Sequence, residues 1–240
     1  MCGQGWRYHY IDKVDVPTAP ALVFGSAFHG ATEKYITDGG DLSALWQENW
    51  TAQCERNQSI DWGAESAEGL VDTGRRMVTA KPVTTLLDEL RAQYDVTNEK
   101  CGVERKVTLS VPGVPVPVIG YIDFVGTDGI PGDFKTAGRM WSDSQAADSM
   151  QSLFYLAALN QAGIEVPGWK FRHYVFTKTA KPAAQTFEVA HKPSELFWLF
   201  QMIQAAWKGI EAEVYPLNPG TWKCSAKWCE YWHLCRGKYN

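Results

Sequence analysis

The stretch Gly120-Tyr-Ile-Asp-Phe-Val125 and the later stretch Asp133-Phe-Lys135 decide the fold. The first is an apolar run interrupted by one carboxylate, Asp123, and it is typical of a buried β-strand. Asp128-Gly129 lies between the two stretches, and Asp-Gly is the strongest short signal for a hairpin turn. Because side chains alternate along a strand, the aspartate and lysine of the second stretch should share one face, with Phe134 opposite.

The two strands bring two carboxylates and a lysine close together. An unpaired carboxylate in an apolar strand is costly to bury, so Asp123 and Asp133 each need a cation. Carboxylates are preferred ligands of Mg²⁺, and a neighbouring lysine can orient or help to deprotonate an attacking water. The pattern therefore suits metal-assisted phosphodiester hydrolysis. A structural ion pair with Lys135 is the alternative for each aspartate.

Four motifs in chain order resemble the PD-(D/E)xK nuclease superfamily, and specifically its RecB-like exonuclease branch. They are Gly25 to His29, Gly120 to Asp123, Asp133 to Lys135, and Gln151 to Tyr155. The resemblance covers nearly the whole chain. It implies an α/β fold with a restriction-endonuclease-like core, in which helices flank a central mixed sheet.

We predict a single nuclease domain over residues 1–240, with a helical insertion at about 38–100 and a cysteine-rich tail at 214–240. The expected strands are Glu104–Ser110, Val116–Val125, Ile130–Lys135, Trp169–Thr177 and Ala184–Ala190. The expected helices outside the insertion are Ala19–Ile36, Asp143–Gln161 and Ser194–Glu213, the last with Ser194 as its N-cap.

The resemblance also implies roles for individual residues. Metal ligands would be His29, Glu104, Asp123, Asp133 and the backbone carbonyl of Phe134. Lys135 would serve the nucleophile, while Gln151 and Tyr155, four residues apart on one helical face, would flank the site. The expected cofactor is Mg²⁺ or Mn²⁺, and a neutral imidazole accepts Mn²⁺ more readily. Each of these roles has a structural alternative. His29 could be a core histidine, Glu104 could be an exposed strand end, and Gln151 with Tyr155 could only cap the sheet.

Iron–sulfur members of this branch carry one cysteine before the first motif and three near the C-terminus. Cys2, Cys224, Cys229 and Cys235 match that arrangement and would bind a 4Fe–4S cluster, which needs one ligand per iron. The tail would then close onto Cys2. Zinc held by the three C-terminal cysteines and His233 is the alternative, although their spacing is looser than usual for zinc. Disulfides are not expected in a reducing compartment, and Cys54 and Cys101 are expected in the core.

The formal net charge of -4 argues mildly against a nucleic-acid partner. Its distribution matters more, because Lys170–Lys192 holds five lysines and arginines with only Glu188 against them. This cluster favours a local phosphate track, and a solvated face is the alternative. The candidate DNA contacts are Arg139, Lys178 and Lys181.

No stretch approaches the roughly 18–20 apolar residues of a membrane span, and no apolar leader is visible. We therefore expect a cytoplasmic protein, in a bacterial cell or a phage-infected host, with no membrane partner. The expected function is a metal-dependent DNA exonuclease acting on single strands or free ends, in recombination, repair or phage DNA processing.

Two other functions are compatible with these motifs. One is a CRISPR-adaptation nuclease that trims DNA ends, and the other is a non-catalytic DNA-binding scaffold, a class that characteristically loses the acids or the lysine. The chain has no helicase P-loop, so unwinding would need a partner. Recombination or helicase proteins are candidate partners, and a homo-oligomer is a further candidate.

Overall fold

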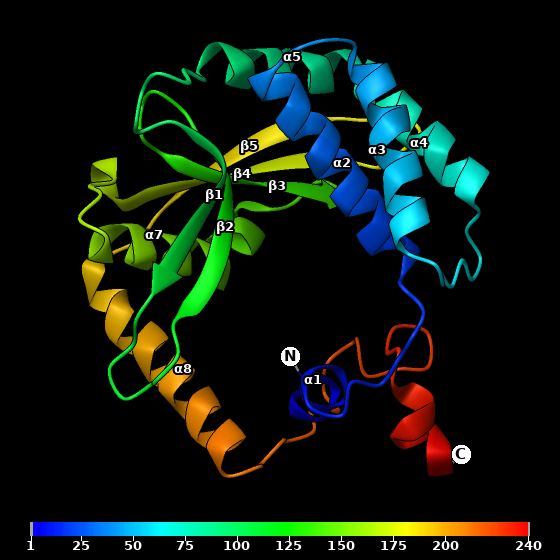
Figure 1. Ribbon diagram of the computed structural model, residues 1–240, viewed down its shortest axis with the longest axis vertical. Coiled ribbons are helices and arrows are strands. Elements are labelled where there is room, and N and C mark those ends of the chain that lie inside the picture. The colour runs from blue at the N-terminus through cyan, green and yellow to red at the C-terminus, as the bar shows by residue number, and fades with distance from the viewer. Residues whose placement is uncertain (1, 240) are drawn as a thin grey trace.

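The computed structural model describes residues 2–239, so Met1 and Asn240 of the predicted domain lie outside the described residues. The chain forms a ring, with the sheet and most helices on one side and the two chain ends on the other (Figure 1). The helices are α1 (Gly3–Tyr10), α2 (Pro20–Thr37), α3 (Leu42–Arg56), α4 (Ala67–Thr79), α5 (Lys81–Ala92), α6 (Asp143–Ala147), α7 (Met150–Gln161) and α8 (Leu196–Glu211). The strands are β1 (Gly102–Leu109), β2 (Val118–Val125), β3 (Pro131–Ala137), β4 (Lys170–Thr177) and β5 (Ala184–Ala190).

The five strands form one mixed sheet in the order β1-β2-β3-β4-β5. All neighbours are antiparallel except β3 and β4, which run parallel, as the sequence predicted for a mixed sheet. The Asp-Gly turn between β2 and β3 is present, with Gly129 at a φ of +71° and its N–H donated to the Gly126 carbonyl. Pairing between β2 and β3 stops after only two residue pairs, and this interruption creates the space for the site.

Helices cover both faces of the sheet and bury two apolar cores. One core packs α2 to α5 against the sheet, and it includes Phe28, Trp46 and Phe134. The other packs α7 and α8 against the opposite face, and it includes Ile122 and Leu156. The region predicted as a helical insertion thus forms α3, α4 and α5, which complete the first core. This arrangement is the α/β sandwich expected from the sequence.

Two helix predictions were wrong in detail. The helix expected over Asp143–Gln161 is two helices, broken at Asp148 and Ser149, where the Ser149 carbonyl accepts the hydroxyl of Ser152. Ser194 is not an N-cap, because it lies inside a 3-10 turn over Pro193–Glu195 that precedes α8. The Glu195 carboxylate accepts the Lys192 N–H at 2.8 Å, as part of a capping box at the start of this turn.

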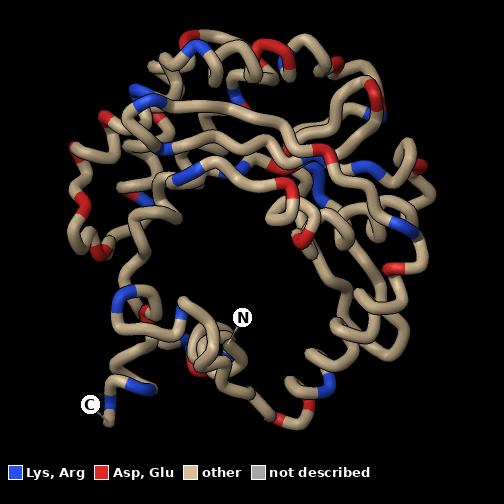
Figure 2. The backbone as a smooth tube through the Cα atoms, turned by 180° about the vertical axis from the view of Figure 1, so that it is seen from behind, with Lys and Arg blue, Asp and Glu red and all other residues tan. Residues whose placement is uncertain are grey.

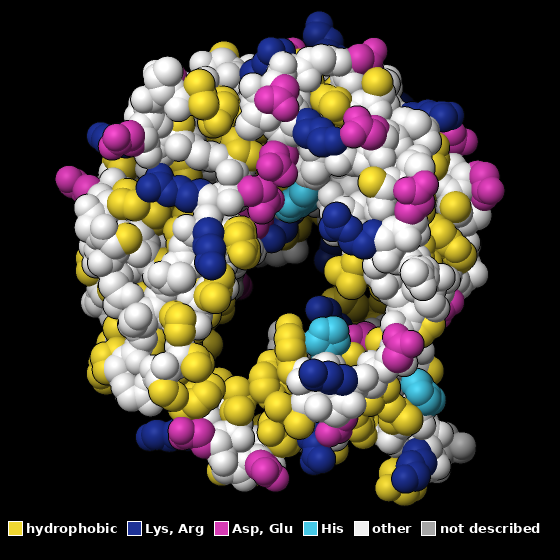
Figure 3. Space-filling view, viewed as in Figure 1, with side chains coloured by type: hydrophobic (Ala, Val, Ile, Leu, Met, Phe, Trp, Pro, Cys, Tyr) yellow, Lys and Arg dark blue, Asp and Glu magenta, His cyan; other side chains and the backbone are white. Residues whose placement is uncertain are grey.

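Contacts between the two chain ends close the ring. The Gly3 N–H donates to the Pro216 carbonyl at 2.9 Å, and the ring of Trp6 stacks on Tyr215. The His9 Nδ1 lies 3.1 Å from the Tyr231 hydroxyl. The space-filling view shows an opening through the molecule, and the backbone seen from behind traces the same ring (Figure 3 and Figure 2). Among the described residues, none of the helices combines the length and apolarity that a membrane crossing would need.

Candidate functional site

Asp123 lies where β2 and β3 cease to pair. Its Oδ2 accepts the Phe134 N–H at 2.5 Å, so the carboxylate replaces the strand acceptor that this N–H lacks. The Phe134 ring points the other way and is buried in the core beneath α2. The buried Asp123 carboxylate thus supplies, in an otherwise apolar strand, the acceptor that the Phe134 N–H needs.

Glu104 and Asp123 lie where the register of β1 and β2 is interrupted, because Val103 pairs with Phe124 and Arg105 with Ile122. Glu104 has a left-handed backbone conformation with a φ of +49°. Such a conformation is strained for a residue with a side chain, and strain of this kind clusters at functional sites. At Glu104, the side chains of β1 and β2 also change from one face of the sheet to the other. Val103 and its partner Phe124 pack in the core beneath α2, whereas Val107 and Ile122 pack in the core beneath α7.

His29 on α2 completes a group of possible metal ligands. Its Nδ1 lies 3.6 Å from the Asp123 Oδ1. One ligand atom each of His29, Glu104 and Asp123 lies within 4.8 Å of the others. Nitrogen and carboxylate oxygen at this spacing suit a divalent cation such as Mn²⁺ or Mg²⁺.

Asp133, Lys135, Gln151 and Tyr155 form a hydrogen-bonded network beside this group. The Lys135 Nζ lies 2.6 Å from the Asp133 Oδ2 and donates to the Gln151 Oε1 at 2.8 Å. The Gln151 amide donates to Asp133 at 2.9 Å and to the Tyr155 hydroxyl at 3.0 Å. Lys135 therefore forms an ion pair with Asp133 and not with Asp123, which faces His29.

The electrostatics of the site favour a cation. Burial raises the pKa of Asp133 to about 6, even with the Lys135 ammonium beside it. Burial, and then the Asp123 and Glu33 carboxylates, raise the pKa of Glu104. The buried Asp133 Oδ2 has the Lys135 ammonium 2.6 Å away as its counter-charge, and a cation bound beside Asp123 would share that role.

Burial alone would lower the pKa of His29, but the Asp123 carboxylate beside it outweighs burial, and the pKa is raised. The histidine is therefore coupled to the acids and is not an isolated core residue. The raised pKa favours the protonated ring, and the ring offers a nitrogen lone pair to a metal only when it is neutral, so a bound cation would take the place of that proton.

Sequence reasoning missed Glu33, which lies one turn after His29 on α2. Burial raises its pKa, the Asp123 carboxylate adds to that effect, and the charge of Glu33 in turn raises the pKa of Glu104. The signal was available, because residues four apart lie on the same face of a helix.

Gly120 shows why the second motif begins with glycine. A Cβ there would lie 2.5 Å from a ring carbon of Phe154 and 2.9 Å from one of Tyr155. Only glycine lets β2 approach α7 closely enough for the Tyr155 hydroxyl to donate to the Tyr121 carbonyl, at 2.5 Å. Gly25 of the first motif has no such requirement, because a Cβ there would meet only Thr136 at 3.9 Å.

The predicted phosphate track is smaller in the structure than in the sequence. Lys170 and Arg172 both pair with Glu188, and Arg172 also pairs with Asp128. The Lys178 Nζ lies 4.9 Å above the Phe24 ring, and burial lowers its pKa. Lys181 and Arg139 are exposed. Of the three candidate DNA contacts, Lys181 and Arg139 can therefore reach a phosphate from solvent, whereas Lys178 is held over Phe24.

The cysteines predicted as cluster ligands come from both chain ends. Burial raises the pKa of the Cys229 thiol, and the nearby thiols of Cys224 and Cys2 add to the effect. Burial alone would raise the pKa of Cys2, but backbone N–H groups, including those of Gly5 and Asn218, outweigh it, and the pKa is lowered. Such donors stabilise a thiolate, which is the form that binds metal.

The thiols of Cys2, Cys224 and Cys229 lie close enough for their charges to interact. Over residues 2–239, no three of the four cysteines and His233 lie within 4.8 Å of one another, so they do not form a closed tetrahedral group in this structure.

The two remaining cysteines have other surroundings. Cys54 is half-buried against the core beneath α2, as expected, whereas Cys101 lies outside the described core clusters. The Cys101 thiol contacts the Gln93 carbonyl in the loop before β1. Its placement in the core was therefore wrong.

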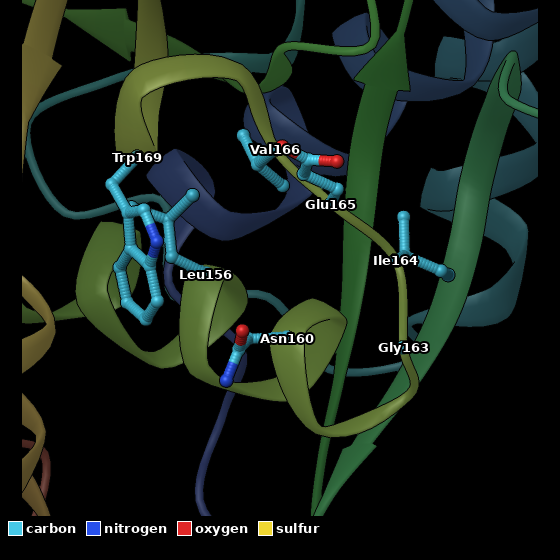
Figure 4. A pocket seen from close by; sticks show the side chains of 7 residues that line it. All are labelled: Leu156, Asn160, Gly163, Ile164, Glu165, Val166 and Trp169. Atoms are coloured by element: carbon cyan, nitrogen blue, oxygen red, sulfur yellow. The ribbon is translucent and has the colours of Figure 1, made fainter.

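A pocket at the C-terminal end of α7 is separate from this site (Figure 4). Its lining residues are Leu156, Asn160, Gly163, Ile164, Glu165, Val166 and Trp169. Only one of them, Glu165, is ionisable, so the pocket lacks the groups for acid–base or metal chemistry. The ionisable groups that could act in a reaction lie instead where β2 and β3 separate.

Buried acids, a histidine and a lysine gather where a strand pair of the mixed sheet is interrupted, and this set of donors can hold a divalent cation. The family model for the PD-(D/E)XK nuclease superfamily matches residues 1–236, and the chain belongs to this superfamily.

Two solved structures resemble the chain. An exonuclease candidate from Eubacterium rectale is 11% identical, with a TM-score of 0.58 over 100% of this chain and 82% of that one. A protein named SSO0001 is 12% identical, with a TM-score of 0.40 over 99% of this chain and 94% of that one. The first likeness supports the fold. No curated protein sequence matches the chain.

Proposed function

We propose that this nuclease is a metal-dependent DNA exonuclease of the RecB-like branch, acting on free DNA ends in recombination, repair or phage DNA processing. The observation that carries the proposal is the ring with its reactive group at the edge of the opening. β2 and α2, which carry Asp123 and His29, border the opening (Figure 1). Acidic and histidine side chains gather at its rim (Figure 3).

The metal site in this proposal consists of His29, Glu104 and Asp123, with Asp133 and the Phe134 carbonyl as further ligands. When bound, Mg²⁺ or Mn²⁺ polarises a phosphate and lowers the pKa of a bound water. Retention of every acid and of the lysine argues against a non-catalytic scaffold.

Lys135 positions the nucleophile. Its amine is fixed by Asp133 and Gln151, yet its side chain remains 28% exposed, so water can reach it. The ammonium can donate to the attacking water or to a phosphate oxygen, where it stabilises the negative charge that develops. Gln151 accepts from this amine and donates to the Tyr155 hydroxyl, so the pair holds the lysine in place.

The preference for free ends follows from ring closure. A strand passes through a closed ring only if one of its ends enters first, whereas a closed circle cannot enter. Exposed Arg139 and Lys181 would contact the phosphates of the strand, and Lys178 would add positive charge nearby.

A 4Fe–4S cluster held by Cys2, Cys224, Cys229 and Cys235 would fasten the ring. Three of these cysteines lie in the tail and the fourth begins α1, which is where the two chain ends already touch. The proposed role is structural, because nothing near the acids requires electron transfer.

A time course on labelled single-stranded DNA tests the exonuclease. Linear DNA labelled at one end and a covalently closed circle of the same sequence are each incubated with the protein and Mn²⁺ or Mg²⁺. We expect the linear strand to be shortened from an end and the circle to survive. Equal cleavage of the circle would refute the exonuclease, and survival of both would refute the nuclease assignment for DNA.

A further inference from the structure

The β1–β2 hairpin carries an exposed aromatic and aliphatic strip next to the site. Tyr121 is 50% exposed and Ile119 is 51% exposed, although both lie on a strand whose other face is packed. Gly120 and Ile122 face α7, so alternation directs Tyr121 and Ile119 to the opposite face. In the sheet register, exposed Lys106 lies beside Tyr121, and exposed Thr108 lies beside Ile119.

The strip is fixed in position relative to the catalytic lysine. The Tyr121 carbonyl accepts the Tyr155 hydroxyl, which in turn accepts from Gln151, the partner of Lys135. Tyr121 precedes Asp123 by two residues, or about 6.8 Å along a strand. A group bound on this strip therefore lies beside the phosphate that is cleaved.

An exposed aromatic ring with a lysine next to it suits single-stranded nucleic acid. A base offers a flat face that stacks on the ring, and its phosphate pairs with the ammonium group. In a duplex, both faces of each internal base are covered by neighbouring bases. The strip can therefore accept an unpaired base and cannot accept a paired one.

We propose that Tyr121, supported by Ile119 and Lys106, is a stacking platform that positions an unpaired base beside the cleaved phosphate and selects single strands over duplex. This inference rests on the proposed nuclease function and deepens it. β2, which carries two of the three residues, borders the opening through which the strand would pass (Figure 1).

Steady-state kinetics on a linear single-stranded oligonucleotide test the platform. Loss of stacking in Tyr121→Ala should raise KM about 5- to 150-fold, with a much smaller change in kcat. Tyr121→Phe keeps the ring and should behave like the wild type. Tyr239→Ala is the matched control, because Tyr239 is 84% exposed but lies in the C-terminal tail. The preference for single strands over duplex should fall in Tyr121→Ala alone.

A binding readout separates stacking from chemistry. Oligonucleotides with 2-aminopurine at successive positions are added to Lys135→Ala protein with Mn²⁺, and one position should show strong quenching that Tyr121→Ala removes. Lys106→Ala should reduce the slope of log K against log salt by about 0.7, the value for one phosphate on a single strand.

The outcomes distinguish this inference from the function on which it rests. If the wild type cuts DNA but Tyr121→Ala has the KM, the strand preference and the quenching of the wild type, the platform is refuted while the nuclease stands. If the wild type cuts no DNA, the proposed function itself fails. A Tyr121→Phe variant as impaired as Tyr121→Ala would also overturn stacking, because it retains the ring.

Discussion

Replacing Lys135 with alanine should separate cutting from binding. The change removes an amine that lies 2.6 Å from Asp133 and 2.8 Å from Gln151. It leaves His29, Glu104 and Asp123 in place, and these three supply the metal group. We therefore expect the variant to bind Mn²⁺ and DNA as the wild type does, but to lose cleavage.

The size of each effect follows from what the amine touches. Loss of a positioned group that transfers or stabilises a proton or charge costs about 10²- to 10⁴-fold in kcat. Asp133 and Gln151 each lose one partner, and an unsatisfied buried group costs about 1–3 kcal/mol of unfolding free energy. The lower end applies here, because the lysine side chain is 28% exposed and water can replace it.

Three measurements on one preparation check this prediction. Cleavage of end-labelled DNA gives kcat, titration calorimetry gives the affinity for Mn²⁺, and fluorescence anisotropy gives the affinity for DNA. Lys135→Met is the matched control, because it keeps the length of the side chain without the charge, and it should be equally inactive. Wild-type cleavage by Lys135→Ala would refute the site, and so would loss of Mn²⁺ binding with the fold intact.

Three further changes test other parts of the account. Asp123→Ala should lose measurable Mn²⁺ binding by calorimetry, because a hard cation held by few ligands cannot lose one carboxylate; unchanged affinity would exclude Asp123 as a ligand. Gly120→Ala should destabilise the fold by about 1–3 kcal/mol in urea unfolding, because its methyl group would meet Phe154, and an unchanged midpoint would contradict that contact. Anaerobically purified protein should be brown with about four irons per chain. Cys224→Ser should lose the colour and the protection of circular DNA, whereas stoichiometric zinc would contradict the cluster.

The sequence predicted those parts of the site that depend on local periodicity. Alternation placed Asp133 and Lys135 together with Phe134 opposite, and the four-residue spacing placed Gln151 beside Tyr155. The sequence also predicted the mixed sheet and the order of its elements. The alternation and the four-residue spacing are each fixed within one strand or helix, whereas the mixed sheet was implied by the family resemblance.

The remainder depends on contacts between distant residues. The left-handed backbone at Glu104 arises where β1 meets Asp123, and no local signal at Glu104 marks it. Part of the reduction of the basic cluster came from Asp128, in the turn between β2 and β3, which pairs with Arg172 on β4. The ring depends on α1 meeting Tyr215 and Tyr231, more than 200 residues away along the chain. A pattern within one segment cannot show where its partner will lie.

The most direct test of the central claim is the position of the metal. A crystal of the wild-type protein grown with Mn²⁺ is measured near the manganese absorption edge, and the anomalous difference map is calculated. We expect a peak within coordination distance of His29, Glu104 and Asp123, on the side of Asp133 that faces the opening. A fully occupied manganese elsewhere, with no peak between these three residues, in a preparation that cuts DNA only with Mn²⁺, would contradict the account.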